Sequence, residues 1–312
     1  MQDLIVSTLI QGLIYALISF GVYFTYTILD FPDLSVDGSF PLGAAVTAVL
    51  LTRGMNPWLT LLVAMVIGAL AGLVTGLIHV RLRIRDLLAG IITMTALFSI
   101  NLQIAGSNLT IDRSTDTIFT SPAAMALFGK LSLLGRKLVI SLILVIILKL
   151  LIDWFFKTKF GLLLCAVGDN STLVTTLACD RGRVKIIGLV ISNALVALSG
   201  CIVCHELRSF SATMGTGQVV FGLATVIIGI STFRWWSNTR AARRLRTVKG
   251  MRWLSDPKGT TAVIVGSIIY KLCIQLAMSL GMPANMMKLI TAVLFLLVLV
   301  LSGRKGEEII RA

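Results

Sequence analysis

The sequence predicts an all-α, polytopic membrane protein, and three observations support this. Hydrophobic residues make up 56% of the 312 residues and charged residues only 13%, whereas soluble domains carry about a quarter charged residues. The mean hydropathy of +0.94 is too high for a soluble chain, which needs a polar exterior. The apolar residues also fall in runs of about 20, the length of a helix that crosses a bilayer.

Seven of these runs are long enough for uninterrupted spans, and they lie at about 4–28, 57–80, 87–106, 134–156, 184–205, 260–280 and 287–302. Two more runs, about 31–52 and 208–233, are equally long but are interrupted by Gly, Pro, Ser and Thr. We therefore expect about eight or nine transmembrane helices. The two interrupted spans are placed as inverted repeats would place them. The whole chain, 1–312, is expected to be one membrane domain without a soluble module.

The N-terminal run has no basic segment or cleavage site before it, so we expect a retained first helix and not a signal peptide. The five cysteines are an odd number and fall mostly in apolar runs, which argues against a disulfide framework. The net charge of +14 comes from clusters in the connections, which is typical of a positive-inside membrane protein and not of a nucleic-acid-binding one.

Lys and Arg in the connections predict the orientation. The basic connections, expected in the cytoplasm, are 79–86, 157–160 with 180–185, 234–253 and the C-terminal tail. The connections 53–57, 107–133, 206–216 and 281–286 lack a basic excess and are expected outside. The side of the N-terminus stays open, because nine spans would place it outside and a re-entrant 31–52 would place it inside.

The most polar stretch, "LDFPDLSVDGSF" at 29–40, contains three aspartates and a proline and no basic residue. Because a helix over 39–52 alone is too short to cross, we expect 31–38 to lie at membrane depth, with Pro32 and Gly38 keeping the backbone out of a helix. Irregular backbone there must be buried in protein or line a watery cavity, and carboxylates at that depth indicate a pathway. The alternative is an ordinary exposed turn, for which Asp, Pro and Gly are equally suited.

A second informative stretch, 161–189, lies in a connection expected in the cytoplasm. Gly168 is expected to end one helix, and Asp169, Asn170 and Ser171 are each suitable N-caps for the next. Leu173, Val174 and Leu177 would then share one face of a short amphipathic helix, which could bind a groove of a soluble partner. The alternative is a helix that rests on the membrane surface.

At this point the sequence resembles the permeases of ATP-binding cassette importers of the branched-chain amino-acid and ribose type. Within them it is most similar to a small subgroup, some members of which are linked to aromatic amino acids. The resemblance rests on "LDFPDLSVDGSFPLGAA" (29–45), "LAGIITMTALFSINLQIAG" (88–106), "VVFGLATVIIG" (219–229), the stretch from 161 to 200 and "GSIIYKLCIQLAMSLGMPANMMKLITAVL" (266–294). These motifs occur in order over essentially the whole chain.

The resemblance implies a multi-pass permease of the bacterial cytoplasmic (inner) membrane. From the expected amphipathic helix in a cytoplasmic loop and the two interrupted spans, we expect it to move a small polar solute, such as an amino acid, by alternating access. Its expected partners are a second copy of the permease, ATP-binding cassette ATPase subunits that hold the ATP and Mg, and an extracytoplasmic substrate-binding protein. The loop at about 157–185 would carry the helix that couples to the ATPase, opened by Gly168, Asp169 and Asn170. The substrate path would be lined by Phe31, Pro32, Asp33, Leu34, Ser35, Asp37, Gly38, Ser39, Thr93, Thr95, Asn101, Thr213, Met214 and Gly215.

The sequence departs from the family pattern at Cys165, at the apolar residue before Asp180, at Ile230 and in the long basic loop at about 234–258. The first two affect the expected docking of the ATPase, and the loop could add a contact to it or to anionic lipid. No G-x-x-x-x-G-K-[ST] motif occurs, so ATP hydrolysis is expected on a partner and this chain is not expected to be an enzyme or to hold a cofactor.

Two other functions fit parts of the sequence. One is an ion-coupled secondary transporter that uses Asp33 or Asp37 as a proton or cation site. The other is a redox protein, because "CIVCH" at 201–205 fits the haem-attachment pattern C-x-x-C-H and, with Glu206, could be part of a zinc site. Its position inside an apolar span favours buried, structural cysteines instead.

Overall fold

The computed structural model describes residues 2–169, 180–238, 258–283 and 286–303. In chain order its elements are α1 (Gln2–Val22), the π-helical turn η1 (Tyr23–Ile28), α2 (Val36–Thr52), α3 (Pro57–Arg81), α4 (Asp86–Ala105), β1 (Asn108–Thr110), α5 (Pro122–Phe128), α6 (Leu133–Phe155), α7 (Lys159–Asp169), α9 (Arg181–Leu207), β2 (Ser209–Ser211), the 3-10 turn η2 (Ala212–Gly215), α10 (Gln218–Asn238), α13 (Gly259–Ser279) and α14 (Met287–Gly303).

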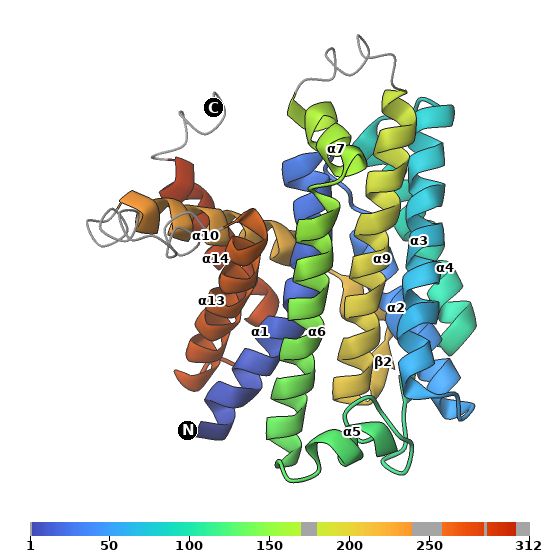
Figure 1. Cartoon of the computed structure of the whole chain (residues 1–312), viewed down its shortest axis with the longest axis vertical. Coiled ribbons are helices and arrows are strands. Elements are labelled where there is room, and N and C mark those ends of the chain that lie inside the picture. The colour runs from blue at the N-terminus through green and yellow to red at the C-terminus, as the bar shows by residue number, and fades with distance from the viewer. Residues whose placement is uncertain (1, 170–179, 239–257, 284–285, 304–312) are drawn as a thin grey trace.

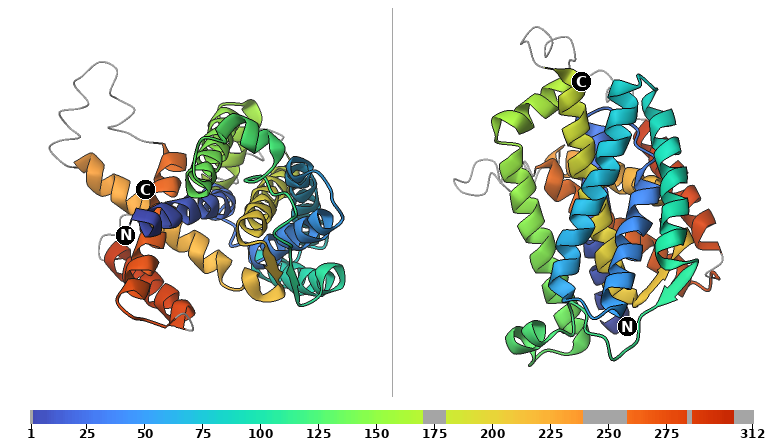
Figure 2. Two further views of the ribbon diagram at one scale, coloured as in Figure 1. Left: turned by 90° about the horizontal axis from the view of Figure 1, so that it is seen from below. Right: turned by 90° about the vertical axis from the view of Figure 1, so that its right-hand side faces the viewer.

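The long helices α3, α4, α6 and α9 run roughly alongside one another, with α9 between α3 and α6 (Figure 1). Helix α10 lies obliquely to them and extends away from α9 toward the side where α13 and α14 pack (Figures 1 and 2). At a rise of about 1.5 Å per residue, helices of 20 to 27 residues such as α4 and α9 match a hydrocarbon core of about 30 Å. The predicted all-helical, multi-pass fold is confirmed.

Among the described residues, seven helices are long and apolar enough to cross a membrane. One of them is the second interrupted span, which runs from Ala212 to Arg234. The first interrupted span, α2, is a shorter apolar helix of 17 residues, and so is α14, where the sequence predicted an uninterrupted span at 287–302. Helix α2 begins at Val36, so Gly38 is helical, and the prediction that Gly38 keeps the chain out of a helix is wrong. A Cβ at Gly38 would lie about 3.0 Å from Leu97, so this glycine instead lets α4 approach α2.

Helix α9 is buried over most of its length because small residues let its neighbours approach closely. A Cβ added at Gly68 or Gly72 of α3 would meet the backbone of α9, and one added at Gly200 of α9 would meet the carbonyl of Phe40 in α2. Small residues at helix interfaces are typical of membrane proteins, where apolar surface alone does not drive helices together. The contact fixes α2, α3 and α9 as one unit, and this unit carries the candidate site.

The two ends of the bundle differ in structure. One end holds α5 and the antiparallel ribbon of β1 and β2, in which Leu109 pairs with Phe210 (Figure 1). The side chain of Arg208 donates to the carbonyls of Asp112 (2.8 Å) and Thr115 (2.9 Å) and closes the connection before α5. The N-terminus lies at this end, opposite α7 (Figure 1). Since the connection 107–133 is expected outside, this placement matches the nine-span alternative.

Candidate functional site

The chain between η1 and α2 leaves the helical path and enters the protein. Phe31 N–H donates to Thr25 O (2.9 Å) as the π-helical turn ends, and Asp30 has a positive φ of 50°. The Phe31 side chain is fully buried and its ring lies 5.0 Å from that of His79 at the end of α3. The alternative of an exposed turn is therefore wrong for most of the stretch, although Asp30 and Pro32 are exposed.

Asp33 is buried in a hydrogen-bonded network centred on Asn193 of α9. Its Oδ1 accepts from Ser35 N–H (2.8 Å) and its Oδ2 from Asn193 Nδ2 (3.0 Å). The amide oxygen of Asn193 accepts from the hydroxyls of Ser35 (3.1 Å) and Ser39 (2.5 Å). Because a buried polar group is stabilised only when it is hydrogen-bonded, this network is what holds the non-helical stretch against α9.

Asn193 is the central residue of this network, and the sequence analysis did not identify it. A polar amide within the otherwise apolar "GLVISNALVALSG" was the available signal, since polar residues inside a span usually have a specific partner.

Asp37 joins the two interrupted spans. Its carboxylate accepts from the backbone N–H groups of Gly217 (2.9 Å) and Val219 (2.8 Å), which open α10. An acidic group at a helix N-terminus satisfies free N–H groups and interacts favourably with the helix dipole. The sequence analysis paired these two stretches only by their placement; the structure brings them into contact.

Backbone contacts also join the two interrupted spans. Pro41, inside α2, cannot donate to the carbonyl of Asp37 four residues earlier. Gly215 packs against that carbonyl so closely that a Cβ at this position would clash with it. We call the residues 29–39 together with 212–219 the junction.

The other predicted path residues divide into two groups. Asn101 is buried and its Nδ2 donates to Gly38 O (3.1 Å), so it lies at the junction. Thr93 is buried on the same face of α4, two turns earlier, and its hydroxyl donates to Ala89 O (3.0 Å). Thr95 is exposed and bonds only carbonyls of its own helix, so the prediction that it lies behind the stretch is wrong. Residues two positions apart on a helix, such as Thr93 and Thr95, point to different sides of it.

In the second interrupted span, Thr213 is exposed, Met214 is half-buried and Gly215 is buried. In the first, Phe31, Ser35, Gly38 and Ser39 are buried, and Leu34 and Asp37 are half-buried. The predicted path residues with access to solvent at the junction are thus Pro32, Leu34, Asp37, Thr213 and Met214.

Two buried acceptors flank the junction without a partner among the described residues. They are Oδ1 of Asn101, whose Nδ2 binds Gly38, and Oε1 of Gln218, which lies between the two residues that donate to Asp37. A buried acceptor that lacks a donor is costly, so a water or a donor group of a passing solute would be favoured at each.

The predicted coupling helix is only partly described. Asn170, Ser171, Leu173, Val174 and Leu177 lie outside the described residues. Helix α7 is described as far as Asp169, one residue beyond Gly168, so the prediction that this helix ends at Gly168 agrees with the structure to within one residue. Gly168 packs against the backbone of Ile28, where a Cβ would clash.

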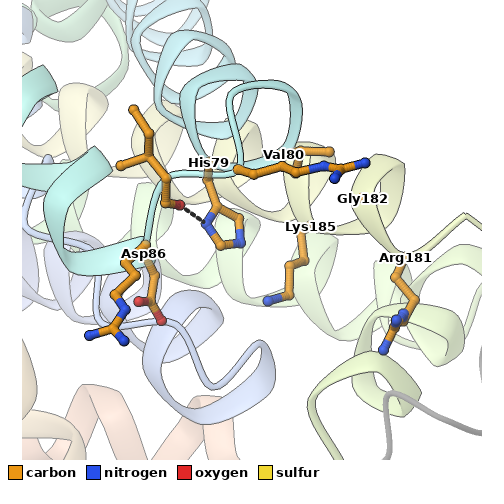
Figure 3. A pocket seen from close by; sticks show the side chains of 9 residues that line it. His79, Val80, Asp86, Arg181, Gly182 and Lys185 are labelled. Carbon is orange, nitrogen blue, oxygen red and sulfur yellow. Dashed lines mark hydrogen bonds between the residues drawn. The ribbon is translucent and has the colours of Figure 1, made fainter.

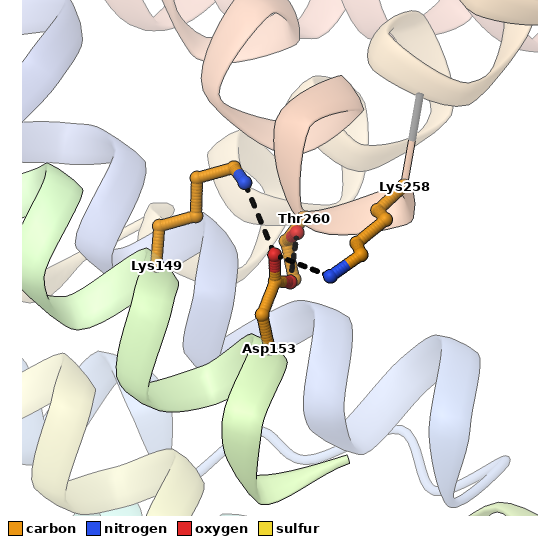
Figure 4. Close-up of polar contacts among 4 residues, drawn as sticks. All are labelled: Lys149, Asp153, Lys258 and Thr260. Atoms are coloured by element: carbon orange, nitrogen blue, oxygen red, sulfur yellow. Dashed lines mark hydrogen bonds and ion pairs between the residues drawn. The ribbon is translucent and has the colours of Figure 1, made fainter. Parts of the chain in front are cut away.

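Two charged sites inside the bundle escaped the sequence analysis. Asp153 near the end of α6 accepts from Lys149 (3.1 Å), Lys258 (2.9 Å) and Thr260 (2.7 Å), and so ties α6 to the start of α13 (Figure 4). In the middle of α13, the Lys271 ammonium lies 3.4 Å from the centroid of the Tyr15 ring, a cation–π contact with α1.

The "CIVCH" stretch is packed into the bundle. Cys201 and Cys204 are fully buried, and Nε2 of His205 lies 2.9 Å from the hydroxyl of Thr60. Within the described parts of the chain, no group of three or more His, Cys, Asp or Glu is arranged to hold a metal ion.

Comparison with known proteins adds to this geometry. The family described as branched-chain amino acid transport system / permease component matches residues 4–299. A tyrosine transport system permease protein of Clostridioides difficile is 41% identical over 94% of this chain and 89% of its own length. A probable branched-chain amino acid transport permease protein LivH of Methanocaldococcus jannaschii is 29% identical over 64% of this chain and 67% of its own. The ribose import permease protein RbsC of Escherichia coli K12 is 28% identical over 63% and 60%. No solved structure gives a significant match.

Proposed function

The chain belongs to the permease components of branched-chain amino acid transport systems, and from this premise we propose that it imports an amino acid with an aromatic side chain. It is a multi-pass protein of the inner membrane and a transport component of the ATP-binding cassette type. The aromatic substrate is supported by the relative named for tyrosine transport, whose match extends over nearly the whole of both chains.

We propose that ATP hydrolysis on a partner subunit drives the import. The observation that carries this proposal is that the helices before and after the segment 170–179 each contact the junction or the residue directly before it. On one side, Gly168 of α7 packs against Ile28 at the start of the non-helical stretch. On the other, Asn193 of α9 is hydrogen-bonded to Asp33 and Ser39.

A force applied to 170–179 would therefore act on the junction from two helices. The junction continues through Asp37 to the N-terminus of α10, so the two interrupted spans would move together. Packed interfaces of this kind change between discrete arrangements and do not deform continuously, as alternating access requires.

We also propose that the ammonium group of the substrate meets the free acceptors at the junction. Both carboxylates, Asp33 and Asp37, already accept hydrogen bonds, whereas Asn101 Oδ1 and Gln218 Oε1 do not. The importer would contain two copies of this chain, two ATPase subunits and an external binding protein, as the resemblance to the family implies.

The test is reconstitution. The permease, the ATPase subunit and the binding protein encoded beside it are reconstituted with proteoliposomes. Uptake of radiolabelled tyrosine is then measured with ATP supplied on the cytoplasmic side of the permease. We expect uptake that needs all three proteins and survives collapse of ion gradients. Uptake that persists without the ATPase but stops with an ionophore would refute the proposal and favour the ion-coupled alternative.

A variant tests the route of coupling. Gly168→Val should lower tyrosine uptake by tenfold or more while the ATPase still binds and hydrolyses ATP, because the contact with Ile28 is lost. Gly135→Ala is the matched control, since a Cβ there meets only ordinary contacts of about 3.4 Å or more. Equal uptake by the two variants would show that α7 does not transmit the motion.

A further inference from the structure

A pocket of about 550 Å³ opens between the α3–α4 connection and the start of α9 (Figure 3). Nine residues line it: His79, Val80, Arg83, Ile84, Arg85, Asp86, Arg181, Gly182 and Lys185. The Lys185 side chain points into it from α9, with His79 and Asp86 on the opposite side, and Arg181 borders it farther along the α9 side (Figure 3).

The lining is strongly basic. Arg83, Arg85, Arg181 and Lys185 face one carboxylate, Asp86, which leaves a net formal charge of +3 with His79 counted as neutral. Within the described parts of the chain, no ion pair joins any of these four cations to a carboxylate. Like charges gathered around one cavity repel, so an anion in the pocket would relieve this repulsion.

Local contacts hold the pocket in this shape. Nδ1 of His79 lies 2.9 Å from Ile84 O, and the ring packs edge-on against Phe31. The Lys185 ammonium lies 6.0 Å from the centroid of the same Phe31 ring. Arg83 has a positive φ of 54°, which a non-glycine residue rarely adopts.

The pocket lies where three spans leave the apolar region. Helix α3 ends at Arg81, α4 begins at Asp86 and α9 begins at Arg181, all on the side expected in the cytoplasm. Directly before Arg83 of this lining, Leu82 is 66% exposed, and we call it the apolar rim of the pocket. A ligand with an anionic head and an apolar tail fits this combination, because the head meets the arginines and the tail covers the leucine.

We propose that this pocket binds the phosphate of an anionic phospholipid from the cytoplasmic leaflet. Arginine presents a planar fork of donors that matches phosphate oxygens, and lysine adds a point charge. Basic pockets between membrane helices on the cytoplasmic side are suited to such headgroups. A soluble phosphate would use the same cations but would leave the apolar rim uncovered, and an acidic surface of a partner protein would need no rim at all.

The experiment measures lipid retention on the purified full-length chain. The protein in detergent is titrated with phosphatidylglycerol or with phosphatidylcholine, and bound lipid is counted by native mass spectrometry. The double variant Arg181→Gln/Lys185→Gln is compared with Arg81→Gln/Arg183→Gln. The control pair loses the same charge from neighbouring positions but does not line the pocket, and Arg183 is an exposed residue paired with Asp180 at 3.3 Å.

We expect wild type to retain phosphatidylglycerol over phosphatidylcholine. Each basic residue near an anionic lipid contributes roughly fivefold, so the pocket pair should weaken this binding about 25-fold and the control pair by less than about threefold. If the pocket pair does not fold, Arg83→Gln/Arg85→Gln removes two cations from the opposite wall and carries the same expectation.

Three results would overturn the proposal. Equal loss in the pocket and control pairs would mean general attraction to positive charge. Inorganic phosphate that displaces the lipid at equal phosphate concentration would identify a soluble anion as the ligand. Displacement of one lipid for each ATPase subunit added would identify the pocket as a protein interface.

Discussion

Replacement of Asp37 is the most direct test of the junction. Its carboxylate accepts two backbone hydrogen bonds, from Gly217 and Val219, at 2.9 and 2.8 Å. Hydrogen bonds to a charged group contribute about 1.5–3 kcal/mol each, and loss of a helix cap alone costs about 0.5–2 kcal/mol. Because Asp37 is only half-buried, water can replace part of the loss, and we expect Asp37→Ala to cost about 2 kcal/mol.

Asp37→Asn should cost about half of this, since the amide keeps one acceptor oxygen and loses the charge. The matched control is Asp30→Ala, in the same stretch but exposed. Unfolding is followed with a thiol-reactive fluorogenic dye on the purified protein, because Cys201 and Cys204 are fully buried and react only when the bundle opens. We expect Asp37→Ala to lower the melting temperature by about 4 °C and Asp30→Ala by less than about 1 °C.

Equal melting temperatures for the two alanine variants would refute the capping role of Asp37. A second refuting result would combine two observations. The Asp37→Asn protein would melt like wild type but no longer transport, and uptake by the wild-type protein would depend on an ion gradient. That combination would mean that the carboxylate binds a cation and not the start of α10.

Three further predictions concern the packing around the junction. Asn193→Ala removes the donor to Asp33 and the acceptor of two hydroxyls, so we expect it to destabilise the protein by about 3 kcal/mol in the same dye assay, and a loss below about 1 kcal/mol would contradict the network. Gly72→Val should prevent stable folding because its Cβ would meet the backbone of α9, whereas Gly135→Ala should leave the yield of monodisperse protein unchanged. Equal yields for the two variants would contradict the close approach of α3 to α9. Asp153→Asn removes the carboxylate that Lys149 and Lys258 share, so we expect it to destabilise the protein by about 3 kcal/mol. Part of this stability should return in Asp153→Asn/Lys149→Gln, and a double variant that melts no higher than the single one would argue against the Lys149–Asp153 pair.

The apolar runs alone were enough to predict the spans. Their length and composition reflect the thickness of the bilayer, which acts on each helix separately and therefore appears in the local sequence. Predicted boundaries such as 57–80 and 134–156 differ from α3 (Pro57–Arg81) and α6 (Leu133–Phe155) by at most one residue at each end. The polar stretch at 29–40 was recognised for the same reason, since polar residues are rare in such a chain.

What each polar residue does depended on partners far away along the chain. Asp37 is expected from sequence to face a path, but it caps α10, which begins 181 residues later at Gln218. Asn193 sits in a helix that looks uniform in sequence, and only the packing of α9 against the junction gives it two serines and an aspartate as partners.

The sequence by itself thus determined that the chain is a helical membrane protein, where its spans lie and which two of them are interrupted, because the solvent constrains each segment locally. Only the tertiary structure decided that the interrupted spans meet, that Gly38 and Gly168 let neighbouring segments approach closely, and that the basic residues at 83, 85, 181 and 185 surround one pocket. Such outcomes depend on which helices pack together, and that choice is made by contacts between segments about 60 to 180 residues apart.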